Sequence, residues 1–75
     1  MYMFIRNEIK ARARLTRGLL SILKDDIDML NIDAENLNLI SIEESIKETK
    51  DTLADIIDNL NEMEYAVVSL KEVRR

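Results

Sequence analysis

The feature that most constrains the fold is an apolar repeat in the second half of the chain, with alternating steps of four and three residues. Steps of this kind average about 3.5 residues, which is the spacing of the a and d positions of a coiled coil. Its members are Ile42, Ile46, Thr49, Leu53, Ile56, Leu60, Met63, Val67 and Leu70. A stripe this narrow predicts a long helix that packs along another helix.

Residues 2 to about 30 are predicted to form that other helix, and their apolar residues lie on two neighbouring lines. One line contains Ile5, Ile9, Thr16, Leu20, Leu23, Ile27 and Leu30. The second line contains Phe4, Ala11, Leu15, Leu19, Ile22 and Met29. Together the lines cover about half of the helix circumference, which is more than one neighbouring helix can cover. We therefore expect one line to meet the second helix and the other to meet a different chain.

These patterns predict a single all-α domain over residues 1–75, an antiparallel hairpin of two long helices. The first helix is expected at about 2–30, the connection at 31–41 and the second helix at about 42–74. Ser41 and Glu44 form an S-x-x-E capping box that favours a helix start at Ser41.

Two helices side by side enclose no interior, so we expect two hairpins to dimerise into a four-helix bundle. The residues expected in the oligomer core are Ile9, Leu20, Leu23, Ile27, Leu53, Ile56, Leu60, Met63, Val67 and Leu70.

Three residues of the first helix interrupt its pattern. Glu8 and Arg12 lie within the apolar arc at a spacing of four, which predicts an ion pair between them. Such a pair is either a device that sets the register of packing or a place where the arc frays into solvent. Gly18 is the only glycine of the chain. The apolar lines keep their phase across it, which favours a continuous helix over a helix-turn-helix break.

A basic stripe follows the opposite face of the first helix. It consists of Arg6, Lys10, Arg14, Arg17 and Lys24. Residues 1–24 carry six basic side chains and one acidic side chain, although the chain as a whole has a net charge of −4. A stripe of this kind attracts phosphates, anionic lipid or an acidic protein surface, or it is an ordinary solvated face.

An acidic stripe follows the back of the second helix. It consists of Glu44, Glu48, Asp51, Asp55, Asp58 and Glu62. Residues 25–64 contain thirteen acidic and two basic side chains. The stripe either binds a basic partner, imitates a nucleic-acid backbone, or keeps the outside of a bundle soluble. A calcium-binding loop at Asp26 is excluded, because Leu30 and Leu37 occupy positions that would need oxygen ligands.

The residue types needed for most catalysis are missing. The chain has no histidine, no cysteine and one glycine, so we expect no enzyme, no catalytic residues, no metal site and no cofactor. No unbroken apolar run is longer than five residues, which predicts no transmembrane segment. The absence of cysteine is compatible with a cytoplasmic location.

Charge and composition predict a small regulator or adaptor that forms a homodimer and binds another protein through its charged helix faces. One alternative is a nucleic-acid-binding protein that uses the basic stripe. A second alternative is an inhibitor whose acidic face mimics nucleic acid. The expected partner-binding residues are those of the basic and acidic stripes.

Overall fold

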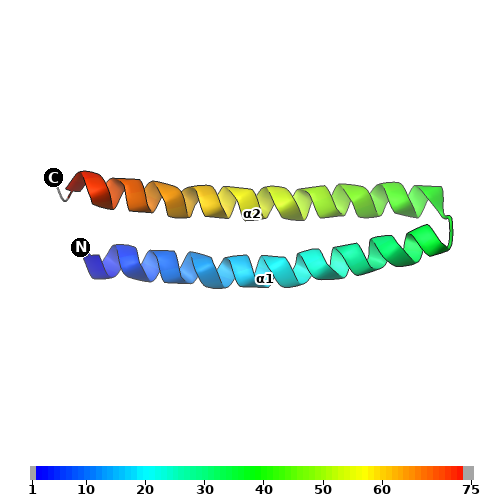
Figure 1. Cartoon of the computed structure of the whole chain (residues 1–75), viewed down its shortest axis with the longest axis horizontal. Helices are drawn as coiled ribbons and strands as arrows, with labels where there is room; N and C mark the ends of the chain where they lie inside the picture. The colour runs from blue at the N-terminus through cyan, green and yellow to red at the C-terminus, as the bar shows by residue number, and fades with distance from the viewer. Residues whose placement is uncertain (1, 74–75) are drawn as a thin grey trace.

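The chain forms an antiparallel hairpin of two long α-helices (Figure 1), as the sequence predicts. The computed structural model describes the backbone of residues 2–73 and the side chains of residues 3–72. Helix α1 spans Tyr2–Glu35 and helix α2 spans Leu39–Val73. The hairpin measures 57 × 16 × 10 Å, so its core is a single line of contact between the two helices.

The connection is much shorter than predicted. It comprises residues 36–38, whereas the sequence predicted 31–41, and α1 continues to Glu35 instead of ending near residue 30. The predicted helix end at Arg74 lies outside the described residues. A connection of three residues is common between antiparallel helices, and it keeps them side by side along their whole length.

The chain turns at Leu37, whose φ of 53° lies in the left-handed region. The amide of Leu37 donates to the carbonyl of Ala34 at 3.1 Å, and the amide of Asn38 donates to the carbonyl of Asp33 at 3.3 Å. This pair of bonds is a Schellman motif, which usually has glycine in the left-handed position.

The predicted capping box at Ser41 is wrong, because Asn38 caps α2. Its side-chain Oδ1 accepts a hydrogen bond from the amide of Ser41 at 3.2 Å, and α2 begins at Leu39. Asparagine is as good an N-cap residue as serine. Asn38 directly follows the turn, so the helix begins there and Ser41 lies within its first turn.

Apolar residues beside the turn are exposed. Leu37, Leu39 and Ile40 retain 78%, 73% and 72% of their surface. A three-residue turn leaves no room beneath it for these side chains. Helix α1 runs through Gly18 without a break, so the predicted continuous first helix is confirmed.

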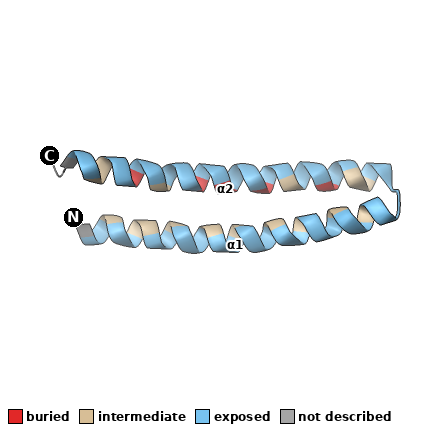
Figure 2. Cartoon of the chain, in the orientation of Figure 1, coloured by how far each residue is buried: buried red, intermediate tan, exposed pale blue. Residues whose placement is uncertain are grey.

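The contact between the helices takes about one residue from each helical turn, and its described α1 members are only half buried (Figure 2). On α2 the buried residues are Ser45, Thr52, Ile56, Asn59 and Ala66. Ile56 and Ala66 are therefore the buried apolar core among the described side chains. Many large apolar side chains of the hairpin are exposed.

We predict that Leu37→Gly raises the free energy of unfolding by about 1 kcal/mol, because glycine adopts the left-handed conformation without a Cβ clash. Leu39→Gly is the matched control, since Leu39 is similarly exposed but helical. That variant should lower stability by about 0.5 kcal/mol. Urea denaturation measures both changes. Equal shifts in the same direction would show that Leu37 carries no conformational strain.

Candidate interaction surfaces

The seam between the helices is unexpectedly polar. Every second member of the predicted apolar repeat lies in the contact with α1 and is buried or half buried. These members are Ile42, Thr49, Ile56, Met63 and Leu70. The members between them are exposed instead, and they are Ile46, Leu53, Leu60 and Val67. Their places against α1 are taken by the residues one position earlier, which are Ser45, Thr52, Asn59 and Ala66.

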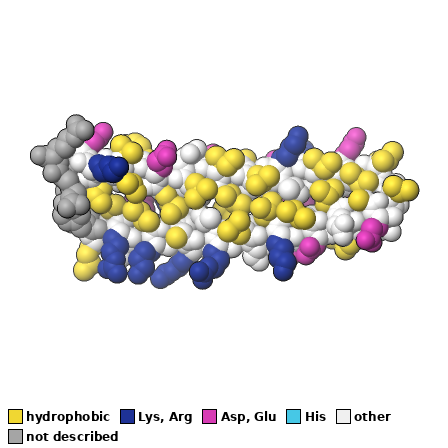
Figure 3. Space-filling model, viewed as in Figure 1, with side chains coloured by type: hydrophobic (Ala, Val, Ile, Leu, Met, Phe, Trp, Pro, Cys, Tyr) yellow, Lys and Arg dark blue, Asp and Glu magenta, His cyan; other side chains and the backbone are white. Residues whose placement is uncertain are grey.

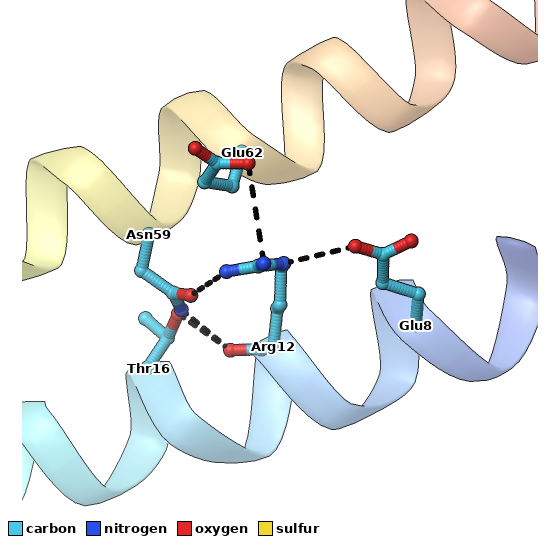
Figure 4. Close-up of polar contacts among 5 residues, drawn as sticks. All are labelled: Glu8, Arg12, Thr16, Asn59 and Glu62. Carbon is cyan, nitrogen blue, oxygen red and sulfur yellow. Dashed lines mark hydrogen bonds and ion pairs between the residues drawn. The ribbon is translucent and has the colours of Figure 1, made fainter.

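A network around Asn59 joins the two helices near the middle of the seam (Figure 4). The Asn59 amide nitrogen donates to the Arg12 carbonyl and to Thr16 Oγ1, both at 2.7 Å. Arg12 Nη1 donates to Asn59 Oδ1 at 3.1 Å. Asn59 retains 5% of its surface, so its amide is satisfied by α1 instead of by water.

Arg12 also carries the ion pairs of this network. Its Nε lies 3.4 Å from Glu8 Oε1, which confirms the predicted pairing, and its Nη2 lies 3.9 Å from Glu62 Oε2 on α2. The Arg12 and Glu62 side chains retain 31% and 60% of their surface. Solvent screens pairs this exposed, so their contribution to stability is small. Asn59 is the buried member of the network.

Two further hydrogen bonds cross the seam towards the turn. Thr52 Oγ1 donates to Asp26 Oδ2 at 2.7 Å, and Ser45 Oγ donates to Asp33 Oδ2 at 2.6 Å. The apolar repeat does not predict these contacts, because all four side chains are polar. A signal was present, since Asp26 and Asp33 are seven residues apart, and so are the partners Ser45 and Thr52.

The residues expected in the oligomer core separate into two groups. Within the hairpin, one group lies in or beside the seam, and it comprises Ile9, Leu23, Ile56, Met63 and Leu70. The other group is exposed by 40% to 50% of its surface, and it comprises Leu20, Ile27, Leu53, Leu60 and Val67. The exposed group is available for contact with another molecule.

The basic stripe is exposed along its whole length. Among the described residues both ion pairs involve Arg12, so none involves the basic stripe. Figure 3 shows Lys and Arg side chains in a row along the α1 edge of a face where hydrophobic side chains cover both helices. A groove of about 410 Å³ opens near the N-terminal end of α1, between residues Met3, Ile5, Arg6, Ile9, Lys10 and Leu70.

The acidic stripe is also exposed, and only Glu62 of its members has an ion-pair partner among the described residues. The described side chains contain no cluster of three or more potential metal ligands. In the part of the chain that the structure describes, no helix combines the length and the hydrophobicity needed to cross a membrane.

Comparison of the chain with protein-family models, with curated proteins and with solved structures gives no match.

We predict that Asn59→Ala lowers the free energy of unfolding by about 1 to 3 kcal/mol, because Arg12 and Thr16 lose buried hydrogen-bond partners. Asn61→Ala is the matched control, since Asn61 lies on the exposed side of the same helix. It should change stability by less than about 0.5 kcal/mol. Thermal and urea denaturation measure both variants. Equal effects would mean that the network does not hold the helices together.

Proposed function

We propose that this chain is a small non-catalytic regulator or adaptor, which forms a homodimer and binds another protein through its charged helix faces. The observation that carries the proposal is the separation of charge on a hairpin with few internal ion pairs. The basic stripe has no ion-pair partner among the described residues, and one member of the acidic stripe has one. Side chains of one sign on an exposed face favour a partner of the opposite sign.

A protein partner is favoured over nucleic acid by the balance of charge. The net charge is −4, and the acidic stripe covers one side of α2 over most of its length. A DNA duplex would meet repulsion from most directions of approach. Nucleic-acid binding through the basic stripe, and mimicry of nucleic acid by the acidic stripe, are the alternatives. The cytoplasm is the proposed location, because a chain without cysteine uses no disulfide for its stability.

The cost of the acidic stripe also supports a partner. Neighbouring carboxylates on one helix face repel each other by a few tenths of a kcal/mol per pair. A basic partner would remove this repulsion on binding, and so would gain affinity from it. The proposal therefore gives the two stripes different roles from the apolar residues, which serve self-association.

The test uses two charge-reversal variants. In the first, Arg6, Lys10 and Arg14 are changed to Glu, and in the second, Asp51, Asp55 and Asp58 are changed to Lys. These residues are exposed and outside the seam, so both variants should fold. We expect one variant to lose partners that the natural chain captures from its host, while duplex DNA is ignored by the natural chain at about 0.15 M salt.

Each stripe has a distinct outcome in this test. Retention of every partner by the second variant, with loss by the first, would assign binding to the basic stripe alone. Binding of duplex DNA by the natural chain, with affinity that falls steeply with salt, would replace the regulator with a nucleic-acid-binding protein. Loss of no partner by either variant would overturn the proposal that charged faces bind.

A further inference from the structure

A row of apolar side chains lies on α2 directly beside the seam. Its members are Ile46, Leu53, Leu60 and Val67, which repeat every seven residues and retain 40% to 46% of their surface. Half-exposed apolar residues at this spacing form a second seam on the same helix, turned away from the first. Within the described part of the hairpin this row is only partly covered.

The neighbouring row on the outer side of α2 is self-complementary in charge. Its members are Glu43, Lys50, Ile57, Glu64 and Lys71, again seven residues apart and all exposed. If two copies of α2 lie antiparallel with their Ile57 residues opposite each other, Glu43 faces Lys71 and Lys50 faces Glu64. Both pairings occur twice, because the arrangement has two-fold symmetry.

The two rows share one centre. The midpoint of the apolar row lies between Leu53 and Leu60, the midpoint of the charged row is Ile57, and the middle of α2 lies beside them. A single two-fold axis at this point aligns apolar with apolar and acidic with basic side chains. The contacts of Thr16 with Asn59 and of Asp26 with Thr52 fix how the two helices are aligned. Leu20 lies between Thr16 and Asp26 on α1, so it is near the level of this axis. Leu20 is also exposed by 50%.

From this arrangement we infer that the occupant of the exposed row is a second copy of the chain, docked antiparallel through α2. The inference rests on the self-association in the proposed function and adds its surface and direction. A parallel dimer would place Lys50 level with Lys50 and Glu64 level with Glu64, so none of these side chains would lie level with an opposite charge. Antiparallel docking places each of them level with a side chain of opposite charge.

The charge of the two ends agrees with this direction. Residues 25–50, which surround the turn, contain eight acidic and two basic side chains, a net charge of −6. The remaining residues contain nine basic and seven acidic side chains, a net charge of +2. Antiparallel copies place unlike ends together, whereas parallel copies place two turns of charge −6 side by side.

The basic side chains that flank Leu20 on α1 would not contribute to this contact. In an antiparallel dimer centred near Leu20, Arg17 of one copy would lie level with Lys24 of the other, and like charges repel. The closest approach is therefore between the two α2 helices. The basic stripes remain at the edge of the dimer, where another molecule can reach them.

The test is a charge swap on exposed residues that leaves the seam unchanged. Lys50→Glu and Glu64→Lys should each raise the dimer dissociation constant roughly five- to tenfold, because two attractive pairs become repulsive. The double variant restores both pairs in reversed form, so its dissociation constant should return to within about twofold of the natural value. Arg14→Glu makes the same change in net charge as Lys50→Glu, but on α1, and should not weaken the dimer. Sedimentation equilibrium measures all four.

The relative direction of the two α2 helices is measured separately by crosslinking. Single cysteines can be introduced for this purpose, because the chain contains none of its own. With a short bifunctional maleimide, Ile57→Cys alone should crosslink to its own copy. Lys50→Cys alone should not, but a mixture of Lys50→Cys and Glu64→Cys should give a crosslinked heterodimer. A dimer in which Lys50→Cys crosslinks to itself, or a double variant as weak as the single variants, would overturn the inference. A monomeric natural chain would overturn it too, and would leave partner binding by the stripes to be judged from the charge-reversal variants.

Discussion

The hydrogen bonds that cross the seam from Ser45, Thr52 and Asn59 are the constraint on which the rest of the structure depends. Each of these side chains is buried and has its partner on α1. A buried polar group without a partner costs about 1 to 3 kcal/mol. Rotating either helix by one residue would break all of these bonds at once. The polar seam therefore sets the register and rotation of the helices more strictly than an apolar seam would.

This choice of seam determines what the hairpin presents to its surroundings. Small and polar residues occupy the line nearest α1, so Leu53 and Leu60 are turned outward and remain half exposed. A monomeric protein rarely leaves large contiguous apolar surfaces open to water. The same rotation of α2 that satisfies Asn59 thus creates the surface suited to a second chain. The polar seam and the exposed apolar row on α2 therefore have the same cause, which is the rotation of α2 about its axis.

Charge follows the same division between inside and outside. Arg12 alone links the helices by an ion pair among the described residues, and it does so from within the seam. The long basic and acidic stripes lie on separate exposed faces, where they cannot neutralise each other. The two proposed roles are therefore compatible: in a dimer docked through α2, the basic stripe lies at the edge of the contact and the acidic stripe lies on a separate face of α2.

The helical class, the two-helix hairpin, the continuity of α1 through Gly18 and the Glu8–Arg12 pair all follow from the sequence alone. These features depend on the spacing and helix propensity of residues that are close together in the sequence. The sequence alone does not determine the short turn at Leu37, the cap at Asn38, or which of two adjacent lines on α2 meets α1. Ile46 and Ser45 differ by one position, and hydrophobicity alone favours Ile46. In the folded hairpin Ser45 takes this place against α1, because Asp33 on α1 accepts its hydrogen bond. That partner is twelve residues away in the chain, so the contact exists only once the helices pack together.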